Sequence, residues 1–443
     1  MKLMVQAYFG GRWHDAAVVT LAEPDKGLAS ASSAGYEMDY WYQHGTQKDQ
    51  VRDLRAYSVE APVDLEDRTA DTWPAFLLDL LPQGRQADRI AAFLGIKAGD
   101  RAAQIQLLLR SASAPVGNLR IREAHEEESK RIGGMARIGV TMDDILARTD
   151  QFLAMTDDFA LIASGSSGLQ GDWPKVALTK SKADGSWYPD PMVADADAED
   201  HVIAKLLRSD EGVDQRILQS EAGYAKVAQN FGLLVERPAT YGNGVLVIPR
   251  FDRGRNAAGG LVRYGQESLV SAIGVAAFGH LEKHETYVAK IQDVSSDPLA
   301  DTIEYLRRDM LNLAMGNPDN HGRNTALRKL LDGQVRLSPL FDFAPMRISL
   351  AGYVRSTKWA CMSAAGGSDI EPDWRVICEA VSRPDVPAED LMAALAEKED
   401  LLRALPDAAR KHGVPDTVIS SAVVRGDDMA DKVAKLRSAP TYG

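Results

Sequence analysis

The chain has 443 residues and a formal net charge of −12 at pH 7, with 45% hydrophobic and 26% charged residues. Its length predicts two or three packed units, because single hydrophobic cores stop growing at about 250–300 residues. The composition is that of a water-soluble globular protein, and no apolar run approaches the ~20 residues that a membrane helix needs. The negative charge argues against broad binding of nucleic-acid backbones.

The N-terminal residues include no sustained apolar segment and no cleavage site for a secretory signal, so we expect a cytoplasmic chain without a membrane partner. Cys361 and Cys378 are its two cysteines, and they lack the C-x-x-C spacing of a zinc or redox site. We therefore expect a buried, reduced pair.

Alternating apolar and polar residues in MVQAYF and AAVVTLAE predict short strands near the N-terminus. The polar stretch AHEEESKRIGG begins at Ala124, ends in a glycine pair and is the best candidate for a linker. We predict an α+β fold with three parts. These are a small β-rich subdomain over residues 1–125, a β-rich lobe with PKVALTK, HVIAKLL and LVIPRFDR over 126–255, and a mainly helical C-terminal lobe over 256–443.

The segment GNPDNHGRN places turn formers and polar residues directly after a helical pattern, which is typical of a loop that serves a site. Its Asp319 and Asn324 have the D-x-x-x-x-N spacing of a kinase catalytic loop, where the Asp is the base and the Asn binds magnesium. The alternative is a turn capped by these residues before a helix. Asp342, at the end of an apolar, strand-like run, favours the kinase interpretation because its carboxylate can chelate a phosphate-bound metal. His321 lacks a second His at zinc-ligand spacing, so we expect it to brace the loop.

The run GSSG at residues 165–168 lies between predicted strands, where small residues let backbone N–H groups approach phosphate oxygens. A flexible turn is the alternative. Lys205 lies in a strand-like segment and Glu221 lies on the inward face of the next helix, which is the order of the kinase Lys–Glu pair at the ATP phosphates. Each could instead be a solvated surface charge. The order of all these features predicts a kinase that uses ATP and Mg²⁺.

With these motifs the chain resembles the HipA family, the kinase toxins of bacterial type II toxin-antitoxin modules. The G-x-Q and PK elements at residues 168–170 and 174–175 resemble the phosphate loop of the family. The RFDR signature stands at residues 250–253, and the N-x-D-x-H-x-x-N loop stands at residues 317–324. The N-terminal runs FLLDLLPQG and PVGNLRI are similar to its small domain.

The resemblance implies a two-lobed, protein-kinase-like fold and a protein serine/threonine kinase, with Lys205 on the α/β-phosphates and Pro249 and Phe251 meeting the adenine through their backbone. It also implies a HipB-like helix-turn-helix antitoxin as partner and contact with DNA only through that antitoxin. The implied protein substrate is an aminoacyl-tRNA synthetase, whose phosphorylation stalls translation. The expected nucleotide-binding residues are Gly165, Ser166, Ser167, Gly168, Gln170, Lys175, Lys205, Glu221, Pro249, Phe251 and His321.

Relatives phosphorylate a serine of their own phosphate loop, and the candidates here are Ser164, Ser166 and Ser167. This loop is longer than in the family because Gly171, Asp172 and Trp173 intervene, which predicts altered phosphate geometry. Two alternatives stay open. A small-molecule kinase of the aminoglycoside or choline type shares the loop chemistry but lacks RFDR and the N-terminal domain, and a catalytically silent scaffold could bind an antitoxin and DNA.

Overall fold

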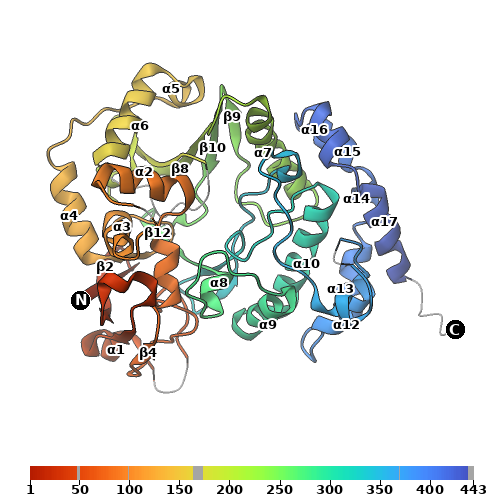
Figure 1. Ribbon diagram of the computed structural model, residues 1–443, viewed down its shortest axis with the longest axis horizontal. Helices are drawn as coiled ribbons and strands as arrows, with labels where there is room; N and C mark the ends of the chain where they lie inside the picture. The colour runs from red at the N-terminus through yellow and green to blue at the C-terminus, as the bar shows by residue number, and fades with distance from the viewer. Residues whose placement is uncertain (47–49, 98, 163–172, 369, 438–443) are drawn as a thin grey trace. The chain divides into compact units, whose positions relative to one another are not determined.

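The computed structural model describes residues 1–46, 50–97, 99–162, 173–368 and 370–437. The chain divides into two compact units, and Figure 1 shows their elements in chain order. The first unit consists of Met1–Arg208, Thr240–Phe278 and Leu327–Val335, and the second of Ser209–Ala239, Gly279–Ala326 and Arg336–Gly443.

The N-terminal part of the first unit is built on a five-stranded antiparallel sheet with the order β4-β3-β2-β1-β5. Strand alternation buries Leu3, Val5 and Ala7 of β1 on one face, where they form a core with helices. The two segments predicted as strands are confirmed as β1 and β2. The bounds are β1 (Lys2–Phe9), β2 (Arg12–Leu21), β3 (Ser32–Tyr36), β4 (Arg68–Ala70) and β5 (Leu119–Ile121).

Short helices pack with this sheet and supply apolar side chains to the same core, which runs from Leu3 to Ala124. The helices are η1 (Pro24–Ala29), α1 (Met38–His44), η2 (Ala75–Leu80), α2 (Gly84–Leu94), α3 (Ala103–Ser111) and α4 (Arg122–Ile132). The last of them corrects one prediction. The stretch expected to be a linker is helix α4, with Glu128 buried, because Glu, Lys, Arg and Ala are good helix formers even where a segment is polar throughout.

A second five-stranded sheet, with the order β7-β6-β8-β10-β9, forms the other half of the first unit. Its core runs from Val140 to Val247 and is separate from the N-terminal core. The three segments predicted as strands are β6, β8 and β10. The elements are α5 (Met142–Ala147), α6 (Asp150–Ile162), β6 (Lys175–Ser181), β7 (Trp187–Pro189), η3 (Asp190–Met192), β8 (Ala198–Leu206), β9 (Thr240–Gly242) and β10 (Val245–Pro249).

Two smaller sheets follow β10, and they include strands that lie within the range predicted to be helical. One pairs β11 with β12, and the other has the order β13-β14-β15. Their elements are β11 (Arg253–Arg255), β12 (Leu261–Arg263), β13 (Gly265–Ser268), α8 (Leu269–Ala272), β14 (Ala326–Lys329) and β15 (Val335–Leu337).

Most regular elements of the second unit are helices in the part that the structure describes. Helix α10 begins cleanly because the Asp297 side chain accepts a hydrogen bond from Ala300 N and Pro298 occupies the first turn. Helix α10 contacts α9 and α13, and α14 contacts α17 (Figure 1). The elements are α7 (Gly212–Asn230), α9 (His284–Val294), α10 (Pro298–Ala314), η4 (Met346–Ile348), α11 (Ala360–Ala364), α12 (Trp374–Val381), α13 (Ala388–Ala396), α14 (Glu399–Arg403), α15 (Leu405–Lys411), α16 (Asp416–Ala422), α17 (Gly426–Ala434) and η5 (Lys435–Arg437).

Three further expectations concern the chain as a whole. The boundaries near residues 125 and 255 stay a proposal. Among the described residues, no helix has the length and apolarity required to cross a membrane. Both Cys361 and Cys378 are free thiols, and Cys378 is buried as expected, but Cys361 is only half-buried, which corrects that part of the prediction.

Candidate active site

The GNPDNHGRN loop belongs to the second unit and follows the end of α10, and β14 begins two residues after it. Gly316 has a φ of 66°, and a side chain there would meet the backbone of Ala422, so only glycine fits this turn. Gly322 lies so close to the Tyr287 hydroxyl that a Cβ would be 2.2 Å from it. A strand and not a helix follows the loop, so the alternative in which its residues cap a helix is wrong.

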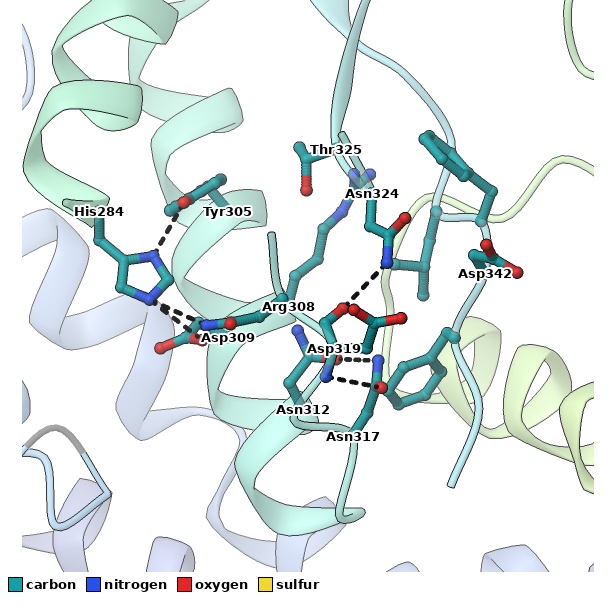
Figure 2. Close-up of a pocket in the computed structure, with 14 residues that line it drawn as sticks. His284, Tyr305, Arg308, Asp309, Asn312, Asn317, Asp319, Asn324, Thr325 and Asp342 are labelled. Atoms are coloured by element: carbon teal, nitrogen blue, oxygen red, sulfur yellow. Dashed lines mark hydrogen bonds and ion pairs between the residues drawn. The ribbon is translucent and has the colours of Figure 1, made fainter. Parts of the chain in front are cut away.

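Hydrogen bonds within the loop fix the two predicted catalytic-loop residues relative to each other. The Asn324 side-chain NH₂ donates to the Asp319 backbone carbonyl over 3.0 Å, and the Asp319 N–H donates to the Asn317 side chain over 3.3 Å. Asn317 in turn donates to the side chain of Asn312 on α10 over 2.9 Å. This chain of bonds ties both residues to the rigid helix (Figure 2).

His321 lies beside the predicted base. Its Nε2 is 3.3 Å from Asp319 Oδ1, and its backbone carbonyl accepts the N–H of Asn324 over 2.9 Å. The Asp319 side chain is 21% exposed and that of His321 is 41% exposed, so both can meet a ligand. The geometry agrees with the bracing that we expected of His321.

Asp342 follows β15 by five residues, in irregular backbone and not at the end of the strand as expected. Its φ of 54° places it in the left-handed region, which a non-glycine residue rarely occupies. Asp tolerates this conformation better than most residues. Strained backbone of this kind collects at functional sites, so the angle supports a functional role for Asp342.

One cavity of the second unit is lined by Asp319, Asn324 and Asp342 together. Figure 2 shows the Asn324 amide oxygen on the side of the pocket where Asp342 lies, because the amide nitrogen is held by the loop. The described residues contain no cluster of three His, Cys, Asp or Glu side chains that could form a closed metal cage. One carboxylate and one amide oxygen fit Mg²⁺, which keeps several waters and takes its other ligands from substrate phosphates.

A buried polar network that lines part of this pocket, through His284, Tyr305 and Asp309, was missed by sequence reasoning. Asp309 on α10 accepts hydrogen bonds from Arg355 over 2.9 Å and from the Trp359 indole over 3.0 Å. His284 Nδ1 is 2.8 Å from the Tyr305 hydroxyl, and its Nε2 is 3.6 Å from Asp309. Burial alone raises the pKa of Asp309, but the charge of Arg355 and the neighbouring His284 hold it below its usual value.

Asn320 connects this network to the catalytic loop. Its side-chain oxygen accepts the N–H of Ser356 over 3.1 Å, and its NH₂ donates to the Thr357 carbonyl over 2.9 Å. The same NH₂ is 3.4 Å from His284 Nε2. No signal in the sequence joins these residues, because they come from segments that are far apart in the chain.

In the first unit, three cations gather where β6 begins and β8 ends. Lys175 and Lys205 are directly opposite each other across the antiparallel pair, so their side chains lie on one face. The Trp173 ring is 5.5 Å from Lys205 Nζ and 4.8 Å from the Arg208 guanidinium carbon. Lys205 is only 2% exposed, which excludes the alternative of a solvated surface charge.

The other predicted nucleotide residues are placed as follows. Glu221 is buried on α7 at 5% exposure and is not a solvated charge. It belongs to the second unit and Lys205 to the first, so their pairing stays a prediction. Pro249 ends β10, and Phe251 is half-buried just after it. Ser164, Gly165, Ser166, Ser167, Gly168 and Gln170 lie outside the described residues, as do Gly171 and Asp172.

The RFDR segment forms a buried ionic cluster in the first unit. Arg250 binds both carboxylate oxygens of Asp252, over 2.9 and 2.7 Å, and Arg253 is bonded to the same group. Asp252 also accepts the backbone N–H of Gly117 over 2.8 Å. Burial raises the pKa of Asp252, but the two guanidinium groups hold it well below its usual value. The charged residues of this signature therefore stabilise the first unit. The role of Phe251 at a hinge stays a prediction.

These observations define the class of protein: an α+β chain with the HipA-like, protein-kinase-like fold. HipA of Shewanella oneidensis MR-1, solved with HipB and its operator DNA, is similar over 98% of this chain and 94% of its own, with a TM-score of 0.62 and 16% identity. Kinase CtkA of Helicobacter pylori is similar over 53% of this chain and 92% of its own at 11% identity, but its TM-score of 0.31 is too low to support a conclusion.

The sequence identifies the family. Residues 167–402, more than half of the chain, match the family described as HipA-like C-terminal domain, and the chain belongs to this family. A curated relative in Sinorhizobium fredii (strain NBRC 101917 / NGR234), "Putative kinase Y4mE", is 32% identical over 134 residues. That match covers 28% of this chain and 31% of the relative, so the chain matches less than a third of its length.

Proposed function

We propose that this chain is an ATP-dependent protein serine/threonine kinase and the toxin of a type II toxin-antitoxin module. The observation that carries the proposal is the cavity in which Asp319, Asn324 and Asp342 meet. A base and two oxygen ligands on one wall are the parts that phosphoryl transfer to a hydroxyl requires, because most of the catalysis comes from positioning and charge stabilisation.

Each residue has a defined task in this reaction. The Asp319 carboxylate accepts the proton of the acceptor hydroxyl, and its bonds to Asn317 and Asn324 hold it in place. Asn324 and Asp342 would hold Mg²⁺, and this ion would supply positive charge beside the transferred phosphoryl group. Lys205, with Lys175 on the same face, binds the phosphates of ATP. Pro249 and Phe251 receive the adenine.

The proposed partners follow from family membership. We place a HipB-like helix-turn-helix antitoxin against this chain, with DNA bound through the antitoxin, and the solved Shewanella protein is described in such an assembly. The proposed substrate is an aminoacyl-tRNA synthetase. A serine among Ser164, Ser166 and Ser167 is proposed as a site of self-phosphorylation. The modification would switch the kinase off, because a dianion beside the phosphate site would repel ATP.

The test is expression of the protein and of Asp319→Asn, with growth measured and the phosphopeptides of the aminoacyl-tRNA synthetases mapped. We expect the wild-type protein to arrest growth and to create a new phosphoserine on a synthetase. The rate of phosphate transfer by the variant should be lower by a factor of ~10²–10⁴. Asp427→Asn, an exposed carboxylate on α17, is the matched control and should behave as the wild type. Arrest that persists in Asp319→Asn would instead support the non-catalytic scaffold. Transfer to an aminoglycoside or to choline and not to protein would support the small-molecule kinase.

A further inference from the structure

A second hollow of about 520 Å³ lies on the second unit beside the candidate active site. Asn312 and Asn317 line both cavities, and Pro318, the residue before the proposed base, also lines the hollow. A segment bound there would therefore lead directly to Asp319.

The backbone fixes the walls of this hollow to the catalytic loop. The Arg347 N–H donates to the Gly316 carbonyl over 3.0 Å, which attaches η4 to the start of the loop. The Lys358 carbonyl accepts the His284 N–H over 3.0 Å, and the neighbouring Thr357 is bonded to Asn320. The hollow is therefore formed by rigid elements that also position the loop.

The charged residues that line this hollow are all basic. Four cations line it, and two are neutralised locally: Arg355 by Asp309 over 2.9 Å and Arg425 by Glu371 over 2.8 Å. Arg347 and Lys358 are exposed, and their side chains make no hydrogen bond or ion pair with any residue that the structure describes. None of the described lining residues is acidic, in a chain whose net charge is −12.

Apolar groups complete the rim. Val354 is 79% exposed and Ile370 is 52% exposed, and Tyr353 lies half-buried between the charged residues. Exposed apolar side chains beside uncommitted cations fit a peptide with both apolar and acidic residues. A nucleic-acid duplex needs a longer row of cations than two, so RNA or DNA fits this hollow less well.

We infer that this hollow binds an extended acidic segment of the protein substrate, next to the hydroxyl that receives the phosphate. The inference rests on the proposed kinase function and adds the charge class of its substrate. Arg347 and Lys358 would attract Asp or Glu residues that flank the acceptor, and the apolar rim would contact the side chains between them.

The experiment is a charge reversal, Arg347→Glu with Lys358→Glu, assayed on two serine peptides that differ only in flanking Glu or flanking Lys. We expect the wild-type protein to prefer the Glu peptide and the variant to lose ~10-fold or more of kcat/KM on it, with partial recovery on the Lys peptide. KM for ATP should not change, because neither residue lines the cavity that contains Asp319, Asn324 and Asp342. Lys411→Glu on α15 is the matched control, since it reverses an exposed charge far along the chain from the loop.

Equal turnover of the two peptides by the wild type, or an unchanged preference in the variant, would overturn the inference while leaving the kinase function intact. If the wild type transfers phosphate to neither peptide, fluorescence anisotropy of the labelled Glu peptide measures whether the hollow binds it. Binding that the double reversal abolishes supports the hollow even though the proposed transfer has failed. Absence of peptide binding overturns the inference, and binding of labelled RNA in its place reassigns the surface to nucleic acid.

Discussion

Asp342 has an unusual backbone angle and is also a proposed metal ligand. Its effect on stability and its effect on metal binding can be measured separately. Its φ of 54° is tolerated by Asp and Asn and costs about 1–2 kcal/mol for other residues. Asp342→Asn should therefore keep the stability of the protein while it loses the carboxylate. We expect phosphotransfer to fall by roughly 10²–10³, because one preorganised electrostatic group is removed.

The readouts are Mn²⁺ binding by electron paramagnetic resonance, kinase activity and thermal unfolding. Asp342→Ala is the control for the backbone, since it should lose the activity and also ~1 kcal/mol of stability. Full metal binding and activity in Asp342→Asn would show that the angle serves only the fold.

Trp173 carries the second prediction at the scale of one residue, because its ring lies beside Lys205 and Arg208. A cation–π contact holds an ammonium group in place and is worth about 0.5–2 kcal/mol. Trp173→Leu keeps an apolar side chain but removes the ring, so we expect KM for ATP to rise by roughly 3–10-fold with little change in kcat. Trp173→Phe retains a ring and should lie close to the wild type. An unchanged KM in Trp173→Leu would show that Lys205 is positioned by other groups.

The two cysteines give a prediction about pH. The pKa of Cys361 is raised to about 12, mainly by burial and also by the neighbouring Glu285. Burial likewise raises the pKa of Cys378 to about 12. Only the thiolate is alkylated, so the native protein should resist iodoacetamide at pH 8 and react only as the pH approaches the raised pKa. Mass spectrometry of the native and the urea-unfolded protein checks this. Rapid native alkylation at pH 8 would contradict it.

At the scale of elements, the turn after β10 depends on Asp252. This carboxylate joins Arg250, Arg253 and the backbone of Gly117 in a buried cluster. Asp252→Asn removes the carboxylate that bonds both guanidinium groups and leaves only Asp190, 3.4 Å from Arg250, as a buried counter-charge. We therefore expect the free energy of unfolding to fall by about 3 kcal/mol. Urea unfolding measures it. Asp407→Asn removes an exposed partner of Arg410 and should cause no measurable change. An equally stable Asp252→Asn would mean that the cluster is not needed for the fold.

The same scale shows what the sequence could predict. Helical spacing placed Glu221 on the inward face of α7, and this residue is buried. Turn formers identified the catalytic loop. The helix α4 was missed because its polar residues give no apolar stripe. The network of Asp309 and Arg355 was missed because contacts across 46 residues of chain leave no local pattern.

At the scale of the whole molecule, composition and periodicity were enough for the α+β class but not for every element. Strands β13, β14 and β15 lie within the range predicted to be helical. They were missed because strands of three or four residues are too short to display a period of two. The left-handed angle of Asp342 also has no signal in the sequence, since Asp occurs in every type of loop. Residue spacing predicted Asp319, Asn324 and Asp342, which the structure brings to one cavity, while their roles stay a prediction.

The net charge of −12 carries the last prediction, which concerns the molecule and not one site. Non-specific binding of DNA depends on cations that displace counterions from phosphates, and such complexes have Kd values of about 10⁻⁴–10⁻⁶ M at physiological salt. Among the cations that line the hollow beside the loop, only Arg347 and Lys358 are uncommitted. The purified chain alone should therefore bind a labelled random duplex more weakly than about 10⁻⁴ M. Anisotropy at several salt concentrations measures this, with the same titration after addition of a helix-turn-helix antitoxin as the comparison. Binding by the chain alone that weakens steeply with salt would contradict the proposal that DNA is reached through the antitoxin, because it would reveal a cationic surface of its own.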